Sequence, residues 1–398
     1  MGESPKITDP LEALEAARAS FDAADDFTVG VEEEFAILDH ATLDMTAGFE
    51  RIDEATRAGT LAGMVAGELI RSEVEVRTGR CETFAEAAHA MARRRLDVVA
   101  AAEGLGYSLA AAGTHPFARW QDQEVINTQH YHLVESTLRY VAWRNNTFGI
   151  HVHTGIRGAA RAVAVSSALR SVLPELLAAS CSSPWLEDRY TYLHSTRTQV
   201  FTKFFPRCGV PDWLGDWDEY ADFVRFLVAT RSIREHTEIW WSVRPHQAFP
   251  TVEVRICDAQ PEFERAVALA GLMTALTAHY ARAHEEGRPL PAHPHRMIEE
   301  NFWRAIRWGM AGELIDLGTG AVMPARARIE SLVEETSDIA SELGISPYLE
   351  PLGRPTAAEV YIARLEEGES VREVWPQVVA RTRESVAEWL AVREGEAR

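Results

Sequence analysis

Hydrophobic and polar residues alternate along four short segments of the chain, at residues 27–38, 72–78, 146–156 and 250–258. Because successive side chains of a β-strand point to opposite faces, this alternation predicts four strands, each with one apolar and one polar face. The polar faces carry ionisable residues in every segment, namely Glu32 and Glu34, then Glu73, Glu75 and Arg77, then His151 and His153, and finally Glu253 and Arg255.

If the four strands belong to one sheet, helices cover their apolar faces and their polar faces line a common cavity. We expect seven side chains to meet there: Glu32, Glu34, Glu75, His151, His153, Glu253 and Arg255. Glu33 falls on the apolar side of its strand, so we expect it to have a structural role or to support a metal ligand, and not to bind the metal itself. Glu73 is predicted to be solvated or paired with Arg77.

Apolar residues spaced three and four apart predict long helices between these strands and in the C-terminal quarter of the chain. Residues 1–26 form a polar leader in which Asp9-Pro10 opens an amphipathic segment. Strand signals stop after about Arg296. The pattern therefore predicts an α+β protein with one main domain at residues 27–300 and a helical part at residues 301–398 that packs on it.

Composition narrows the class of partner. A formal net charge of −20 argues against nucleic acid and anionic membranes, since both attract a basic surface. The four cysteines are widely scattered without a CxxC pair, which is typical of a reducing cytoplasm, and we find no signal peptide or run of about 18 apolar residues. We therefore expect a cytoplasmic protein that acts on small molecules.

Several carboxylates a few ångströms apart repel one another, and when partly desolvated they become protonated unless cations compensate them. Mg²⁺ and Mn²⁺ are the natural compensators, because both prefer carboxylate oxygens and accept phosphate as a further ligand. Alternation is equally typical of an antiparallel sheet whose polar face meets water, so both interpretations stay open on the pattern alone. P-loop, Rossmann and G-x-S-x-G motifs are absent from the sequence.

Six motifs in order along residues 27–310 carry a family resemblance. They are GVEEEF (30–35), ELIRSEVEVRT (68–78), GTHPFARW (113–120), FGIHVHTGI (148–156), HSTR (194–197) and IWWSVRPHQAFPTVEVRICD (239–258). With these motifs the chain resembles the carboxylate-amine ligases of the glutamate-cysteine ligase type 2 family. A coincidence of six motifs is far more specific than any single one.

The resemblance implies a glutamine synthetase-like catalytic fold, in which a curved, mainly antiparallel sheet carries helices on its convex face and holds ATP and Mg²⁺, or Mn²⁺, on its concave face. It implies metal ligands at Glu32, Glu34, Glu68, Glu75 and Glu253. It implies catalytic roles for Arg255, Glu253 and Arg244, and cofactor contacts from His151, His153, Arg255 and Arg197. Weaker assignments place Thr114 and His115 at the substrate, and a homo-oligomer such as a dimer is expected.

Glu68 and Glu75 are seven residues apart, so in one uninterrupted strand they would face opposite sides. If both are metal ligands, a turn or bulge must lie between Leu69 and Ser72. We predict that break.

The activity implied by the resemblance is ATP- and Mg²⁺-dependent amide formation through an acyl phosphate. The family favours the γ-carboxyl of glutamate as the activated group and cysteine or another amine as the acceptor. The alternatives are a guanidino-kinase-like phosphotransferase on the same fold, a metal-dependent amide hydrolase, and a nucleotide- or metabolite-binding relative without catalysis. The sequence does not identify the general base.

Overall fold

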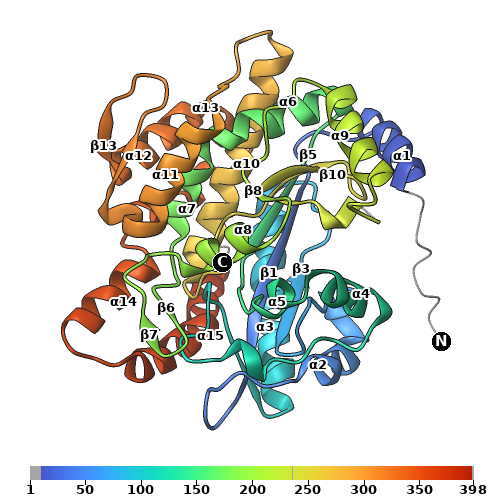
Figure 1. Ribbon diagram of the computed structural model, residues 1–398. Helices are drawn as coiled ribbons and strands as arrows, with labels where there is room; N and C mark the ends of the chain where they lie inside the picture. Colours follow the sequence, from blue (N-terminus) through green and yellow to red (C-terminus); the bar gives the residue numbers. More distant parts are fainter. Residues whose placement is uncertain (1–9, 235, 397–398) are drawn as a thin grey trace.

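The computed structural model describes residues 10–234 and 236–396, and its centre is a seven-stranded sheet (Figure 1). Six strands follow the order β10-β11-β5-β1-β3-β2, and β4 also pairs with β1. All of these pairings are antiparallel. The strands are β1 (Val29–Asp39), β2 (Val65–Ala66), β3 (Glu73–Arg77), β4 (Tyr107–Ala110), β5 (Ile150–Gly155), β10 (Val243–His246) and β11 (Thr251–Val254).

The four predicted strands are therefore confirmed as β1, β3, β5 and β11, and they are neighbours in one sheet. Their apolar side chains, such as Val31, Val152 and Val254, are buried in the main hydrophobic core. This core is completed by three long helices that contact the sheet, α3 (Phe84–Gly104), α6 (Ala159–Leu169) and α10 (Phe263–Glu285). The predicted α+β class with a mainly antiparallel sheet is confirmed.

Shorter elements surround these layers. The other helices are α1 (Pro10–Asp22), α2 (Phe49–Thr56), α4 (Gln129–Leu138), α5 (Tyr140–Trp143), α7 (Leu173–Ser180), α8 (Thr196–Phe204), α9 (Trp217–Ala229), α11 (His295–Trp308), α12 (Ala325–Glu335), α13 (Ser337–Glu342), α14 (Ala357–Glu366) and α15 (Val371–Glu396). Two small sheets pair β6 (Trp185–Leu186) with β7 (Arg189–Tyr190) and β8 (Cys208–Gly209) with β9 (Trp240–Trp241).

The C-terminal part is not purely helical, which corrects the expectation that strands end near Arg296. A hairpin of β12 (Glu313–Ile315) and β13 (Val322–Pro324) lies between α11 and α12. Its turn is closed by Asp316, whose carboxylate accepts hydrogen bonds from the backbone N–H groups of Gly318 and Thr319. The stretch 316–320 (DLGTG) combines Asp with two glycines, which is typical of a turn, and this signal was overlooked beside the helical periodicity of the flanking segments.

The last helix joins the C-terminal part to the central sheet. α15 packs on α3, α10 and β4. The hydroxyl of Thr382 accepts a hydrogen bond from the backbone N–H of Ala111 at 3.0 Å, and the indole of Trp375 donates to the carbonyl of Leu43 at 3.1 Å. The division of the chain at residue 300 stays a prediction, since these contacts join the two parts in one packed body.

The leader contributes to the core instead of lying apart from it. Residues 1–9 fall outside the described residues, and α1 begins at Pro10 as expected. Leu14 and Phe21 of this helix are buried, where they pack toward α6 and α9.

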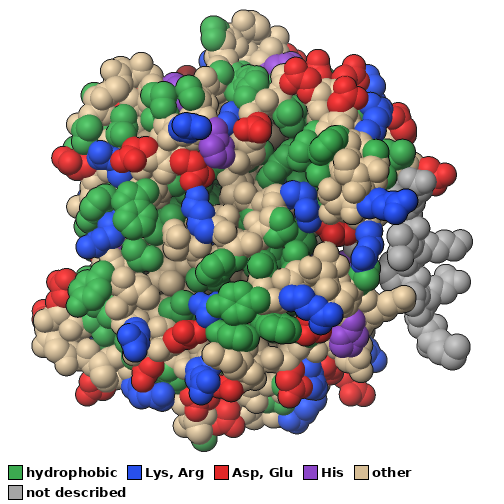
Figure 2. Space-filling view, in the orientation of Figure 1, with side chains coloured by type: hydrophobic (Ala, Val, Ile, Leu, Met, Phe, Trp, Pro, Cys, Tyr) green, Lys and Arg blue, Asp and Glu red, His purple; other side chains and the backbone are tan. Residues whose placement is uncertain are grey.

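The stretch Ala159–Ser180 is long and apolar enough to cross a membrane by length and composition, yet its most apolar 18-residue window is buried inside the protein, where the stretch forms α6 and α7. Burial of that kind is typical of core helices. On the face of the molecule that Figure 2 shows, acidic and basic side chains are interspersed.

Candidate active site

The polar face of the sheet forms the floor of a cavity of about 620 Å³. Directly opposite residues in an antiparallel pair share a face, and the register places Glu34 opposite Glu75, Glu32 opposite His151, and His153 opposite Glu253. The alternation in the sequence thus assigned these side chains to the correct face. The cavity is lined by Glu32, Glu34, Glu68, Glu75, His151, Arg197, Arg244, Glu253 and Arg255, among others.

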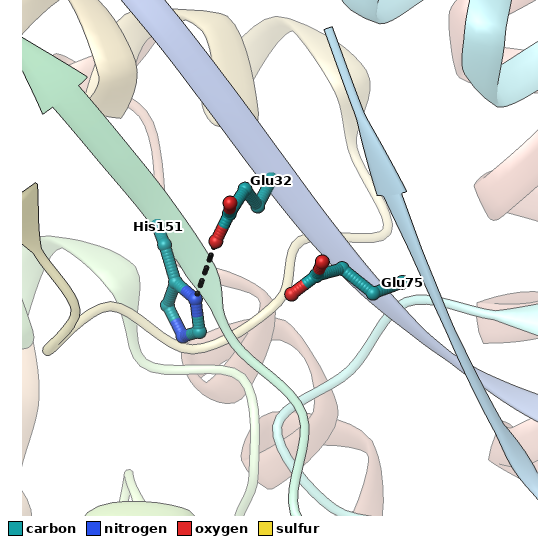
Figure 3. Close-up of side chains that lie close together, drawn as sticks. All are labelled: Glu32, Glu75 and His151. Atoms are coloured by element: carbon teal, nitrogen blue, oxygen red, sulfur yellow. Dashed lines mark hydrogen bonds and ion pairs between the residues drawn. The ribbon is translucent and has the colours of Figure 1, made fainter. Parts of the chain in front are cut away.

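Three groups of these side chains have the spacing of metal ligands. One ligand atom from each member lies within 4.8 Å of the others in the groups Glu32–Glu75–His151, Glu32–His153–Glu253 and Glu34–Glu68–Glu75. Figure 3 shows the first group, in which Glu32 and His151 face one another at 3.4 Å and Glu75 points toward them from the neighbouring strand. Carboxylate oxygens and imidazole nitrogens in such groups fit Mg²⁺ or Mn²⁺.

One ring nitrogen of His153 is a further candidate metal ligand. Its Nδ1 is paired with the hydroxyl of Thr251 at 2.9 Å, whereas its Nε2 is buried without a hydrogen-bond partner among the described residues. That nitrogen faces carboxylate oxygens of Glu32 at 3.5 Å and Glu253 at 3.9 Å. A buried imidazole nitrogen beside two carboxylates is the arrangement that a cation completes.

Crowding of the acids changes their proton affinity. Burial, together with the charges of Glu32, Glu68 and Glu34, raises the pKa of Glu75 well above its usual range. Burial and the neighbouring Glu34 raise the pKa of Glu68 to about 7. Without a cation, the cavity therefore tends to hold protons in place of some of its charges, as expected for carboxylates that a metal ion would neutralise.

Glu68 reaches this cluster because the chain turns before β3. β2 and β3 form a hairpin in which Ala66 pairs with Glu75, and Glu68 lies in the connection between them. Residues 71–72 form a turn that leads into β3. The predicted break between Leu69 and Ser72 is confirmed, and it lets two glutamates seven positions apart enter the same cavity.

At the other end of the cluster, two arginines hold Glu253. Arg244 donates to one carboxylate oxygen at 2.6 Å and Arg255 donates to the other. Although burial raises the pKa of Glu253, the adjacent Arg244 and Arg255 lower it well below its usual range. Glu253 is thus ionised, and its pairing aims both guanidinium groups along the cavity wall.

Arg197 is fixed by main-chain carbonyls. Its guanidinium donates to the carbonyls of Ile256 at 2.9 Å and Arg255 at 3.2 Å. The space beside it requires a glycine, because a Cβ on Gly149 would lie 2.2 Å from Arg197 Nη2. The Nε of Arg197 is buried without a hydrogen-bond partner in the described parts of the chain.

The predicted substrate contacts of Thr114 and His115 are not supported. Neither residue lines the cavity, and each is 0% exposed. The Thr114 hydroxyl donates to the carbonyl of Trp185, and His115 Nε2 lies 2.9 Å from the carbonyl of Leu43. Burial lowers the pKa of His115 to about 4, so it is a neutral core histidine. These side chains stabilise the loop after β4.

The predictions for the two flanking glutamates had different outcomes. Glu33 does point away from the cavity, where it forms a buried ion pair with Arg95, so its structural role is confirmed. Glu73 is neither solvated nor paired with Arg77, which instead lies 3.7 Å from Glu75. Glu73 is 1% exposed and lines the cavity.

A second, largely apolar cavity of about 310 Å³ adjoins the acidic one and was missed in the sequence. It shares Glu32, Arg77 and Phe249 with the acidic cavity. Its other lining residues include Gly30, Val31, Met64, His153 and Pro250. The sequence signal for it was Gly30, two residues before Glu32 on the same face of the strand, since a glycine on the polar face leaves space there.

Binding of Mn²⁺ is expected to strengthen as pH rises. The raised pKa of Glu68, about 7, means that a proton must leave before the carboxylate can bind a cation, so deprotonation between pH 6 and pH 8 favours the metal. For this one group the expected gain in Mn²⁺ affinity is about tenfold. Isothermal titration of the metal-free protein at both pH values measures it, and an affinity that is equal or lower at pH 8 contradicts the assignment.

Comparisons with known proteins identify a family for this chain. A family model described as "Glutamate-cysteine ligase family 2(GCS2)" matches residues 28–358. A protein from Solibacter usitatus named "Putative glutamate--cysteine ligase 2" is 38% identical over 319 residues, covering 80% of this chain and 82% of that protein. "Putative glutamate--cysteine ligase 2-2" from Rubrobacter xylanophilus is 34% identical over 377 residues, covering 95% of both proteins.

Two solved structures share the fold. A bifunctional glutathione synthetase from Pasteurella multocida aligns with a TM-score of 0.66 at 11% identity, over 95% of this chain and 54% of that chain. A glutamate–cysteine ligase from Francisella tularensis, solved in complex with AMP, aligns with a TM-score of 0.59 at 12% identity, over 93% of this chain and 94% of that chain. At these identities the likeness concerns the fold alone.

Proposed function

Because this chain belongs to glutamate-cysteine ligase family 2, we propose that it is an ATP-dependent ligase that joins the γ-carboxyl of glutamate to cysteine or another amine. The observation that carries the proposal is the convergence of acidic, imidazole and guanidinium groups in adjoining cavities above one sheet, among them Glu32, Glu34, Glu68, Glu75, Glu253, His151, His153, Arg244 and Arg255. Such a site matches the needs of phosphoryl transfer, which are positioning and neutralisation of charge.

The two cavities suggest how ATP would lie. The smaller one is apolar and suits a nucleotide base, and it opens at Glu32 and Arg77 toward the acidic cavity, which suits the triphosphate with its divalent cations. The Francisella ligase was solved with AMP, which is consistent with nucleotide use by this fold. Glu32, Glu34, Glu68, Glu75 and the histidines would hold Mg²⁺ or Mn²⁺, and a bound ion would supply charge neutralisation at the phosphates.

The proposed chemistry has two steps. An oxygen of the substrate carboxylate attacks the γ-phosphorus of ATP while the bond to ADP breaks, and the amine then attacks the carbonyl carbon as phosphate leaves and a proton is lost. Arg255 and Arg244, aimed by Glu253, would stabilise negative charge on the transferring group. The buried floor of the sheet would keep water away from the acyl phosphate.

The test is to supply ATP, Mg²⁺, L-glutamate and a panel of amines that includes cysteine, and to measure ADP, free phosphate and product mass. We expect equal amounts of ADP, phosphate and amide, and no turnover when either ATP or the amine is withheld. A phosphorylated product without free phosphate would identify the phosphotransferase alternative. Amide hydrolysis without ATP would identify the hydrolase.

A further inference from the structure

Glu73 is a cavity residue that the chemistry proposed above leaves without a role. It is 1% exposed, and its Oε2 has no hydrogen-bond partner among the described residues. Its position opposite Ala36 on β1 gives it no polar neighbour across the strand pair. A buried carboxyl oxygen without a partner is costly, so its retention in a cavity wall points to a ligand that completes it.

The order of side chains along β3 places Glu73 beyond the residues that would contact ATP in the proposed function. Along β3, Arg77 borders the apolar cavity, Glu75 lies among the predicted metal ligands, and Glu73 comes next. Because alternate residues of a strand are about 6.7 Å apart, Glu73 lies one such step beyond the acids that would surround the γ-phosphate. The order along the sheet is therefore base, phosphates and then Glu73.

The geometry fits an amino acid that is activated at its distal carboxyl. In glutamate the γ-carboxyl carbon and the α-nitrogen are separated by four bonds, a span of about 5 Å. If the γ-carboxylate of glutamate lies at the γ-phosphate, beside Glu34 and Glu75, the α-ammonium group of the same molecule therefore reaches Glu73.

A cation lies on the same side of the cavity. Burial and the charges of Glu34 and Glu68 raise the pKa of Glu73 well above its usual range, whereas the charge of Arg197, which also lines the cavity, lowers it. Arg197 packs on Gly149, whose backbone N–H donates to Glu34 on the strand that pairs with β3. Glu73 Oε2 and Arg197 Nε are both buried without a hydrogen-bond partner in the described structure, while Arg197 Nη1 lies 3.8 Å from Asp258 Oδ1. The two groups together match the two charges of an α-amino acid.

We propose that Glu73 binds the α-ammonium group of the carboxylate substrate and that Arg197 faces its α-carboxylate, so that the site selects α-amino acids. The inference rests on the proposed function for the placement of the γ-carboxyl. It assigns Glu73 a role in substrate selection, distinct from the metal-binding role of Glu75 two residues later.

The experiment measures binding without turnover. Wild-type protein and Glu73→Gln are titrated with L-glutamate, with glutarate, which lacks the ammonium group, and with 4-aminobutyrate, which lacks the α-carboxylate, in the presence of Mg²⁺ and a non-hydrolysable ATP analogue. We expect Glu73→Gln to lower the affinity for L-glutamate about 10- to 100-fold. The affinity for glutarate should stay within about threefold of the wild-type value, because only glutamate loses a charge-assisted hydrogen bond.

Two further variants distinguish a specific loss of ammonium recognition from a general loss of ligand binding. Glu73→Asp keeps the charge and should keep part of the preference for glutamate over glutarate. Glu124→Gln removes an exposed negative charge whose partner, Arg71, lies two residues before Glu73, and it should change neither affinity.

The outcomes distinguish this inference from the proposed function. The inference is overturned if the wild-type protein binds glutamate no more tightly than glutarate. It is also overturned if Glu73→Gln lowers the affinity for both ligands equally. Absence of ATP-coupled amide formation overturns the proposed function and leaves the binding preference to be judged on its own.

Discussion

Glu34→Gln is expected to lower ATP-dependent turnover about 10³-fold while leaving the melting temperature close to that of the wild type. The Glu34 carboxylate accepts a hydrogen bond from the backbone N–H of Gly149 and belongs to the group with Glu68 and Glu75. The amide of glutamine preserves size and shape but carries no charge, so it cannot neutralise a cation at the phosphates. Loss of one preorganised electrostatic group of this kind costs about 10²–10³ in rate, and a displaced metal ion adds to that.

Phosphate release in the presence of glutamate and the preferred amine measures the effect, and thermal unfolding checks the fold. Titration with Mn²⁺ should show weaker or fewer bound ions in the variant. If Glu34→Gln keeps turnover within tenfold of the wild type, Glu34 is not part of the site that activates the carboxylate.

Substitution of the preceding residue is expected to have the opposite phenotype. Glu33→Gln should lower the free energy of unfolding by about 3–5 kcal/mol, because it breaks a buried ion pair and leaves Arg95 without its counter-charge. Arg95 is 0% exposed. Its guanidinium also donates to the carbonyl of Gln260 at 3.1 Å and lies 5.0 Å from the ring centre of Phe263. The few remaining acceptors do not compensate a full positive charge in this core.

Urea unfolding of the wild type, Glu33→Gln, Arg95→Met and the double variant tests this expectation. The double variant should be more stable than either single variant, since it removes both charges together and leaves neither one buried without its counter-charge. The residual turnover of Glu33→Gln at a temperature where it is folded should exceed that of Glu34→Gln by a wide margin. Additive losses in the double variant would show that the two side chains do not act as a pair.

The different positions of Glu33 and Glu34 could be predicted from the sequence. Side chains in a strand alternate with a period of two, so the pattern placed Glu32 and Glu34 in the cavity and Glu33 in the core without any knowledge of tertiary structure. The same rule placed His151, His153 and Glu253 on one face. The break before β3 followed from the separation of Glu68 and Glu75.

Exposure could not be predicted in the same way, because it depends on what covers a strand. Glu73 lies on the predicted face, yet it is buried because segments distant in the sequence, including Tyr131 and Arg197, close that end of the cavity. Thr114 and His115 were assigned by motif alone. Their burial follows from packing against Trp185 and Trp375, which the chain supplies 70 to 260 residues later.

Attachment of α15 to the edge of the sheet has a consequence for biosynthesis. Residues 371–396 cover Ala111 and Leu43, so a nascent chain that has not yet emerged to this point leaves those groups open to solvent and to chaperones. The central sheet, although encoded before residue 260, therefore completes its packing only after synthesis has passed α15.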